Sequence, residues 1–392
     1  MTIKAAMYYP WIYLKGGIER TILELAKRSR HEWTVITNRY LEDETFPEFR
    51  DIEVVELAGL SLERKVFPVA AACLRLLLTK QDWSRYDVVV VSSDGIGNLV
   101  TFRNSDVPLV SLCHTPLKIA YDEDTHDRWL EMHQPGIATR AAVRLFTAVD
   151  KRAWHRYRRI FCVSREVQRR LLVSGVPAKS TEILHPGVDL ERFSPTGRQE
   201  SFFLLPGRIM WTKNIELGIE AFIRLKNRLN GSHPGARLVV AGMVDGKSAP
   251  YLAQIRALAA GREDIEIVTS PSDERLLDLY DRCLAVLFTP RNEDWGIVPI
   301  EGMAFGKPVV AVDRGGPAES IVRGETGYLC EPSPEAFADA MSRILADDDL
   351  YDRMSVQSRR RAGEFTWDRF VGRMDDYLAQ FARDVPTAGA AG

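Results

Sequence analysis

The sequence predicts an α/β protein made of two similar halves, each a parallel β-sheet covered by helices on both faces. Apolar strand segments without polar alternation are separated by amphipathic helices, as is typical of parallel sheets. The turn-rich segment 184–197 interrupts this rhythm, which then restarts. At 392 residues the chain is also too long for one ordinary core. Two such halves joined by a linker imply a cleft between them.

The first half opens with a strand, a glycine-paired turn and a helix. Residues 3–8 form the expected strand and 17–30 the amphipathic helix. The apolar run 86–92 is the clearest parallel strand. The other expected elements are strands at 33–37, 54–57, 107–113 and 159–163 and a helix at 64–79.

The second half repeats the pattern. Its expected strands are 202–206, 237–241, 265–268, 284–289, 307–312 and 327–329, and its expected helices are 215–229, 251–260 and 273–282. A last amphipathic helix starts at Phe365-Thr-Trp367. We therefore expect domains at 1–192 and 193–365, a final helix at 366–385 and a disordered tail at 386–392.

Composition excludes several classes of protein. A formal net charge of −2 gives no general attraction to nucleic acid. The five cysteines are scattered, which favours buried thiols in a reducing compartment over a metal site. The first residues lack the apolar core of a signal peptide, and no apolar run approaches the roughly 20 residues that span a bilayer. We expect a cytoplasmic protein, at most held on the inner face of a membrane.

Two glutamates eight positions apart are the most informative feature. Glu293 lies in the loop after the strand 284–289, and Glu301 is expected in the first turn of the next helix. Ligands of open α/β sheets bind at the carboxyl ends of the strands. A helix N-terminus favours phosphate, and carboxylates accept hydrogen bonds from hydroxyls. A site for phosphate beside a site for hydroxyls is what a nucleotide sugar requires.

Other candidate ligand-binding residues follow neighbouring strands. Arg208 and Lys213 come after the strand 202–206, and two cations there can neutralise a diphosphate. Gly16-Gly17 is either a plain tight turn or a place where a ligand approaches the backbone. His114 follows the strand that ends at Cys113 and is expected to point into the cleft; hydrogen bonding within its own loop is the simpler alternative.

Two further segments are open to more than one interpretation. Residues 313–319 contain a second glycine pair and are expected to form the neighbouring wall of the same pocket. Residues 138–159 hold seven arginines or lysines and one acid, Asp150. They form either a solvated helical face or a basic surface that meets anionic lipid or a phosphorylated acceptor.

Taken in order, these motifs resemble those of glycosyltransferase family 4, whose members are retaining enzymes with two facing Rossmann-like domains, the GT-B arrangement. The resemblance covers nearly the whole chain. Its most specific parts are Gly16-Gly-Ile-Glu-Arg20, Gly187-Val-Asp189, Pro206-Gly-Arg208 with Lys213, Glu293 with Glu301 and Gly306-Lys-Pro-Val309, and Phe365-Thr-Trp367. The last motif resembles the start of the family's crossover helix, which packs back on the N-terminal domain.

The resemblance implies a role for each matching residue. Glu301 would bind the ribose of the donor nucleotide, and Glu293 would hold hydroxyls of the transferred sugar. Arg208 and Lys213 would stabilise the departing diphosphate. The remaining residues expected to bind the donor are Gly16, Gly17, Trp295, Gly296, Ile297 and Val298. His114 would contact the sugar near its reacting carbon, and the first domain would bind the acceptor.

The resemblance also implies a metal-independent reaction without a cofactor. In front-face displacement, the leaving phosphate takes the proton of the acceptor, so stabilising charge on that phosphate matters most. A covalent intermediate on Glu293 is the alternative mechanism. The acceptor would be a glycan, a lipid-linked molecule or a small molecule, as in polysaccharide biosynthesis.

The identity of the donor is indicated by two loops. Residues 114–122 and 293–299 are similar to those of bacterial mannosyltransferases that use GDP-mannose, but Lys118 and Tyr121 stand where that subgroup often has arginine and tryptophan. The sequence therefore favours GDP-mannose. The alternatives are a UDP-sugar transferase for glucose or N-acetylglucosamine, a nucleotide-sugar 2-epimerase of the same fold, and a non-catalytic binding module.

Overall fold

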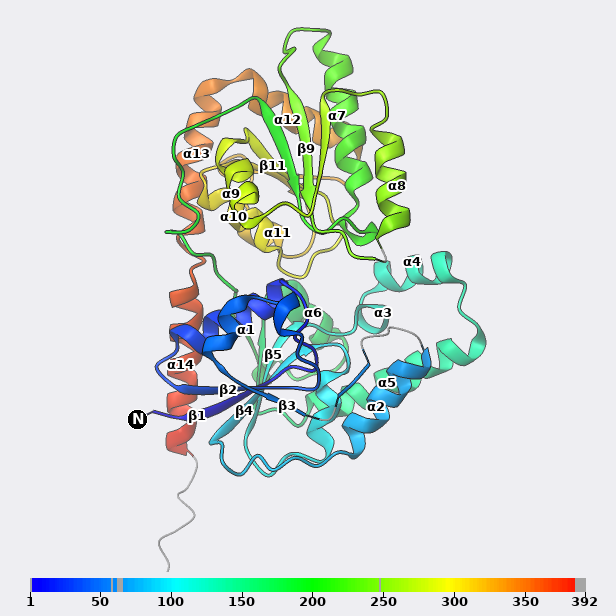
Figure 1. Cartoon of the computed structure of the whole chain (residues 1–392), viewed down its shortest axis with the longest axis vertical. Coiled ribbons are helices and arrows are strands. Elements are labelled where there is room, and N and C mark those ends of the chain that lie inside the picture. The colour runs from blue at the N-terminus through cyan, green and yellow to red at the C-terminus, as the bar shows by residue number, and fades with distance from the viewer. Residues whose placement is uncertain (1, 58, 62–65, 247, 385–392) are drawn as a thin grey trace, which may run out of the picture. The chain divides into compact units, whose positions relative to one another are not determined.

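The computed structural model divides the chain into two compact units (Figure 1). Unit 1 comprises residues 1–186 and 367–392, and unit 2 comprises residues 187–366. The structure describes residues 2–57, 59–61, 66–246 and 248–384. The predicted tail 386–392 and the predicted helix start at 64–65 lie outside the described residues. The first change of unit falls at 186/187, where the sequence suggested 192/193, and the second at 366/367, where it suggested 365/366.

Unit 1 is built on a seven-stranded parallel sheet of order β3-β2-β1-β4-β5-β6-β7. Its strands are β1 (Lys4–Tyr8), β2 (Glu32–Thr37), β3 (Glu53–Glu56), β4 (Val88–Asp94), β5 (Leu109–Thr115), β6 (Arg159–Cys162) and β7 (Thr181–Ile183). The four valines 88–91 of β4 are at most 1% exposed, as the unbroken apolar run predicts for a strand covered on both faces. The short strand β7 was not expected.

The helices of unit 1 follow its strands. They are α1 (Gly17–Arg28), α2 (Val66–Leu78), α3 (Lys118–Tyr121), α4 (Glu123–His133), α5 (Ile137–Trp154), α6 (Arg165–Val173) and α14 (Trp367–Asp384), with the 3₁₀ helix η3 (Ile96–Phe102) after β4. The basic run 138–159 is thus helical up to Trp154 and continues into β6.

Unit 2 has a six-stranded parallel sheet of order β10-β9-β8-β11-β12-β13. Its strands are β8 (Phe202–Pro206), β9 (Arg237–Gly242), β10 (Ile265–Thr269), β11 (Ala285–Phe288), β12 (Val309–Val312) and β13 (Gly327–Cys330). Its helices are α7 (Ile215–Leu229), α8 (Ala249–Leu258), α9 (Asp273–Arg282), α10 (Ile297–Ala304), α11 (Pro317–Ser320), α12 (Pro334–Ala346) and α13 (Asp348–Ala362). Figure 1 shows α7 and α8 on one side of these strands and α9 and α10 on the other.

The strand order reverses direction at one place in each sheet. In unit 1 this switch point lies between β1 and β4, and in unit 2 between β8 and β11. The loops that leave adjacent strands at a switch point diverge to opposite faces and leave a crevice at the carboxyl edge. The topology therefore selects the loops after β1 and β4 and after β8 and β11 as candidate ligand sites.

Helix α14 belongs to unit 1 although it follows unit 2 in the chain. The buried carboxylate of Asp375 accepts hydrogen bonds from Ser29 Oγ at 2.5 Å and from the backbone N–H of Arg30 at 2.9 Å. A ring nitrogen of His31 lies 3.1 Å from the backbone oxygen of Asp375. The last helix is thereby attached to the end of α1 and the start of β2.

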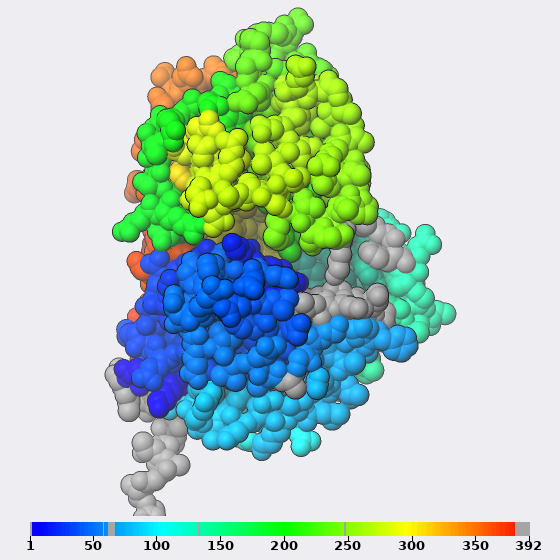
Figure 2. All heavy atoms as spheres, in the orientation of Figure 1, coloured from blue at the N-terminus to red at the C-terminus, as the bar shows by residue number. Residues whose placement is uncertain are grey.

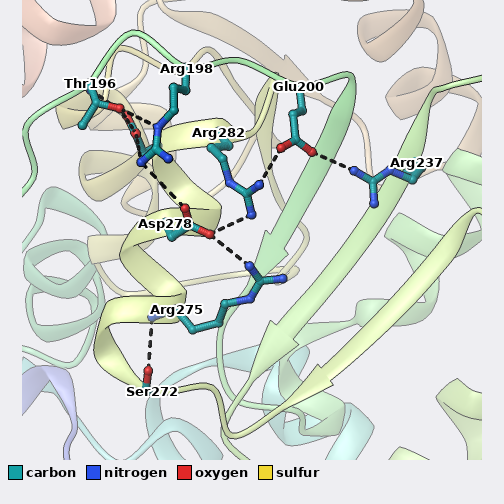
Figure 3. Close-up of polar contacts among 9 residues, drawn as sticks. Thr196, Arg198, Glu200, Arg237, Ser272, Arg275, Asp278 and Arg282 are labelled. Carbon is teal, nitrogen blue, oxygen red and sulfur yellow. Dashed lines mark hydrogen bonds and ion pairs between the residues drawn. The ribbon is translucent and has the colours of Figure 1, made fainter.

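A charged network fixes the segment that leads into β8 (Figure 3). Glu200 contacts Arg282 of α9 at 2.5 Å and Arg237 of β9 at 2.8 Å. Asp278 contacts Arg282 at 2.7 Å and Arg275 at 3.0 Å, both within α9. Because these side chains come from α9, β9 and the entering segment, the network holds three parts of unit 2 together at one end of its sheet.

Candidate active site

Lys213 and Glu293 meet at the switch point of the unit 2 sheet. Lys213 ends a short 3₁₀ helix after β8, and Glu293 lies in the loop after β11. The Nζ atom of Lys213 donates a hydrogen bond to Glu293 Oε2 at 2.6 Å. The two side chains are 22% and 19% exposed, so the pair remains accessible from solvent. The structure thus brings together two residues that lie 80 positions apart.

Two hydrogen bonds hold the loops that carry this pair. Asn214 Nδ2 donates to the backbone oxygen of Thr289 at 3.1 Å, and Thr289 Oγ1 donates to the backbone oxygen of Lys213 at 2.8 Å. Both side chains are buried, and buried hydrogen bonds are costly to break. Asn214 adopts a left-handed conformation (φ 52°), which asparagine tolerates better than most residues. The position of Lys213 is therefore set by the backbone around it.

The start of α10 is shaped by a close approach of the glycine pair Gly315-Gly316. The N–H of Gly316 donates to the backbone oxygen of Glu293 at 2.9 Å. A Cβ on Gly315 would lie 2.1 Å from the oxygen of Glu293, and one on Gly316 would lie 2.1 Å from the oxygen of Trp295. Only glycine permits this contact, which brings the predicted neighbouring wall against the Glu293 loop.

Residues 295–298 form the turn into α10. Trp295 is buried, and its ring packs against Phe365 with centroids 5.2 Å apart. Gly296 has a φ of 81° and precedes the first helical residue, Ile297. Ile297 and Val298 are half-buried at the helix N-terminus, where backbone N–H groups lack intrahelical acceptors. This terminus is suited to an anionic group.

Glu301 lies one turn later than the sequence suggested. It is the fifth residue of α10 and so belongs to the second turn, because the loop after Glu293 extends to Gly296. Its Oε2 accepts a hydrogen bond from Tyr280 of α9 at 2.8 Å. Tyr280 is buried and stacks on Phe305, with the rings 6.0 Å apart and 10° from parallel. Burial, and next the charge of Glu301, raise the pKa of the Tyr280 hydroxyl well above its usual value, so it remains a donor.

Tyr280 was missed by sequence reasoning. It is a tyrosine near the C-terminal end of the amphipathic helix α9, where an aromatic residue normally signals core packing. Nothing in the local pattern indicates that its hydroxyl reaches Glu301 on another helix.

Arg208 is exposed on the loop after β8. Among the residues that the structure describes, no hydrogen bond or ion pair holds its guanidinium. The loop bends at Gly207 (φ 135°), and a Cβ on Gly242 would overlap the backbone oxygen of Gly207. The backbone before Arg208 is therefore tightly packed while its side chain extends into solvent.

In unit 1, Gly16 and Gly17 form the start of α1 after β1. A Cβ on Gly16 would lie 2.5 Å from Glu19 Oε2, whereas one on Gly17 would meet no atom within 4 Å. The atom near Gly16 is the end of a flexible side chain that can move, so this contact alone does not require glycine there. The open space at Gly17 is compatible with the alternative of a ligand approaching the backbone.

His114 lies within β5 and not after it, because the strand extends to Thr115. The pairing of β5 with β4 passes from Cys113 to Thr115 and skips His114, which marks a β-bulge. Its Nε2 is buried, with no hydrogen-bond partner among the described residues. Burial lowers the pKa of His114 to about 3, so the ring is neutral at physiological pH.

No group of three or more potential metal ligands occurs in the described part of the chain. Within the same residues, no helix combines the length and the apolar character needed to cross a bilayer.

Two family models match the chain. The model described as Glycosyltransferase Family 4 matches residues 15–192, and the model described as Glycosyl transferases group 1 matches residues 189–361. The border between the two matches falls close to the change from unit 1 to unit 2.

Curated relatives include mannosyltransferases. The chain is 32% identical over 221 residues to the alpha-1,3/1,6-mannosyltransferase ALG2 of Mus musculus, covering 52% of this chain and 53% of the relative. In that match the chain spans about half the length of the relative. The protein of the same name from Dictyostelium discoideum is 26% identical over 402 residues, covering 89% of this chain and 91% of the relative.

Solved structures share the fold. The Anabaena protein HepE in complex with UDP and glucose superposes with a TM-score of 0.73 over 98% of this chain and 100% of that chain, at 16% identity. The chain has two units, each built on a parallel sheet, and each unit is matched by one of the two family models. The chain belongs to glycosyltransferase family 4 and has the GT-B fold.

Proposed function

We propose that this protein is a retaining glycosyltransferase that moves a mannosyl group from GDP-mannose to a hydroxyl of a glycan, lipid-linked or small-molecule acceptor. The observation that carries the proposal is the contact between Lys213 and Glu293 at the unit 2 switch point, beside the N-terminus of α10. This arrangement supplies a cation and free N–H groups for phosphate and a carboxylate for hydroxyls.

Each residue of the unit 2 site receives the role that the family resemblance implies, and its chemistry is compatible with that role. Glu301, held by Tyr280, would accept hydrogen bonds from the ribose hydroxyls. Lys213, Arg208 and the N–H groups at the start of α10 would bind the diphosphate. Glu293 would hold hydroxyls of the transferred sugar while its charge is balanced by Lys213 at 2.6 Å. That balance makes Glu293 a poorer nucleophile and favours the route without a covalent intermediate.

The proposed reaction is a displacement on one face of the sugar. The bond between the anomeric carbon and the phosphate oxygen breaks, and its electron pair stays on the phosphate. The acceptor oxygen bonds to the anomeric carbon on the same face, and its proton passes to a phosphate oxygen. Charge accumulates on the leaving phosphate, so Lys213 and Arg208 contribute most there.

For unit 1 we propose binding of the acceptor. The low pKa of His114 makes it a weak base, so its unpartnered Nε2 is suited to a hydrogen bond with a ligand hydroxyl and not to proton abstraction. The choice of a mannosyl donor is supported by the names of the mouse and Dictyostelium relatives, which are both called mannosyltransferases.

A thermal-shift panel of nucleotide sugars tests the donor. GDP-mannose should raise the melting temperature more than UDP-glucose or UDP-N-acetylglucosamine. A ligand that binds only the folded state stabilises it by about 2.7 kcal/mol when its concentration is 100 times its Kd. The donor that binds most tightly therefore gives the largest shift. Glu301→Gln should lose most of that shift, whereas Glu325→Gln, on an exposed turn, should keep it.

The stabilising donor is then incubated with candidate acceptors, and the anomeric configuration of the product is read by NMR. Retention supports the proposal. Stabilisation by UDP-sugars alone would contradict the mannosyl donor, and isomerisation of the nucleotide sugar without an acceptor would indicate an epimerase. Binding without turnover on any acceptor would leave only a binding module.

A further inference from the structure

Helix α2 presents an apolar stripe to solvent. Phe67, Leu74 and Leu78 are 88%, 58% and 61% exposed. They are spaced by seven and four residues and so lie on one face of the helix. Ala70 and Ala71 are exposed between them. A soluble protein rarely leaves such a continuous apolar face uncovered.

Helix α5 presents a second apolar stripe. Ile137 and Leu145 are 89% and 68% exposed. Ala141 and Ala148 are also exposed, and the spacing of four, four and three residues places all four side chains on one face. Both stripes therefore consist of apolar side chains at helical spacing.

Cations flank the stripe of α5. Arg140, Arg144, Lys151 and Arg152 are exposed on this helix. In the described part of the chain, the charges of Arg144 and Lys151 are not engaged by any carboxylate. Long cationic side chains of this kind can extend past an apolar stripe and keep their charge at a polar interface.

The only acid of α5 does not reduce this surface charge. Asp150 is fully buried, where it accepts hydrogen bonds from Asn98 Nδ2 at 3.0 Å, Tyr121 OH at 2.7 Å and Trp154 Nε1 at 2.9 Å. Burial raises the pKa of Asp150 to about 6, although these hydrogen bonds favour its charged form. Asp150 therefore contributes to the interior of unit 1, and the charged side chains exposed on α5 are all positive.

The two helices are neighbours in unit 1. Both pack against η3, and Figure 1 draws them at the same end of the unit. Figure 2 shows atoms of α2, in blue, at the surface of unit 1.

We propose that α2 and α5 together form a docking surface for a membrane that contains anionic lipid. The apolar stripes would enter the boundary between headgroups and acyl chains, and Arg140, Arg144, Lys151 and Arg152 would contact the lipid phosphates. This combination of apolar and cationic side chains matches an anionic bilayer surface better than a protein partner, whose interface would need carboxylates opposite each cation. The proposal does not depend on the identity of the donor or acceptor.

Vesicle co-sedimentation tests this surface. The wild-type protein should bind vesicles of phosphatidylcholine with phosphatidylglycerol, bind phosphatidylcholine alone much less, and dissociate at high salt. Arg140→Glu with Arg144→Glu should lower partitioning at least about tenfold, since each basic residue near an anionic surface contributes severalfold. Phe67→Ser with Leu145→Ser should lower it on both vesicle types.

Matched controls lie on α13 of unit 2. Val356→Ser removes a side chain that is 67% exposed, and Arg353→Glu with Arg360→Glu reverses two exposed cations. These variants should bind vesicles like the wild type. Equal binding by all variants, or no binding by the wild type, would overturn the proposal. So would a wild-type dimer that Phe67→Ser with Leu145→Ser converts to monomer without any vesicle binding, because the surface would then serve a second copy of the chain.

Discussion

At the scale of single residues, the unit 2 site consists of two carboxylates in different environments. Glu293 is neutralised by Lys213, whereas Glu301 is held by the neutral hydroxyl of Tyr280. A carboxylate paired with a cation has part of its charge balanced within the protein, whereas a hydroxyl donor orients a carboxylate without adding a positive charge. The two glutamates are therefore suited to different tasks, although the sequence presents them as a matched pair.

The hydrogen bond from Tyr280 predicts the behaviour of one variant. Tyr280→Phe keeps the stack on Phe305 and removes the donor to Glu301. Without this donor Glu301 is less firmly positioned, so the KM for the nucleotide sugar should rise, by up to about tenfold if the full energy of about 1.5 kcal/mol is lost from binding. The value of kcat should change little, because ribose binding is the same in the ground state and the transition state.

Steady-state kinetics on the donor identified by the thermal-shift panel measure this effect. Tyr351→Phe, at a buried tyrosine of α13 in the same unit, is the matched control and should leave KM unchanged. A fall in kcat at constant KM would show that Tyr280 acts on the reacting centre and not on the nucleotide.

The candidate residues could be predicted from the sequence to different degrees. Lys213 and Glu293 were found because both follow apolar strands, and the carboxyl ends of neighbouring parallel strands meet at one edge. The predicted position of Glu301 in its helix was wrong by one turn. The loop before α10 turns at a glycine with positive φ, and the pattern of neighbouring residues does not indicate that conformation. Tyr280 was not predictable, since its partner lies 21 residues away on a different helix.

At the scale of elements, the start of α10 depends on the loop after β12. Gly316 has an ordinary φ of −57°, so the backbone would accept alanine without strain. The obstacle is steric, since a Cβ would lie within 2.5 Å of three backbone atoms of Trp295. The glycine is therefore required by contact with the neighbouring loop and not by its own conformation.

Gly316→Ala should displace the backbone from Glu293 to Trp295 and weaken nucleotide-sugar binding by about tenfold or more, because small misplacements of binding groups are costly. Calorimetric titration with the identified donor measures the loss. Gly235→Ala adds a Cβ that meets no atom within 4 Å and should bind normally. Equal affinity of both variants would show that this contact does not support the site.

The parallel strands were the most predictable elements. Val88–Val91, Phe202–Pro206 and Val309–Val312 are unbroken apolar runs, because a strand covered on both faces has no polar side to show. Among the elements that the sequence analysis did not predict are β7, which has three residues at an edge, and η3, whose buried apolar residues have no clear period. Helix α5 was recognised as basic, but the buried position of Asp150 depends on contacts with three other elements and could not be inferred.

At the scale of the whole molecule, unit 1 is assembled from both ends of the described chain. Asp375 of α14 satisfies Ser29 Oγ and the backbone N–H of Arg30 from a buried position. Asp376, its neighbour, pairs with Arg30 at 2.8 Å but is 67% exposed. Adjacent acids on one helix thus make a buried and an exposed contact with the same segment.

Asp375→Ala should destabilise unit 1 by about 1.5–3 kcal/mol, because it leaves a buried backbone N–H and a buried hydroxyl without their charged acceptor. Asp376→Ala should cost less than about 1 kcal/mol, as expected for an exposed pair. Hydrogen exchange read by mass spectrometry separates the units. Protection should fall in β1 and β2 while β8 and β11 keep theirs. An equal loss in both units would contradict a stabilising role of Asp375 that is confined to unit 1.

The position of α14 in the chain also determines the order in which the protein can be completed during synthesis. The two ends of unit 2 are joined by a hydrogen bond from the N–H of Val188 to the backbone oxygen of Phe365 at 2.9 Å. This unit can therefore fold as soon as its own residues have left the ribosome. Unit 1 is translated first, yet Ser29, Arg30 and His31 wait for partners that emerge only after the whole of unit 2. The first unit to be made is thus the last to be finished, and the surface that α14 covers in the finished protein stays exposed until α14 has been synthesised.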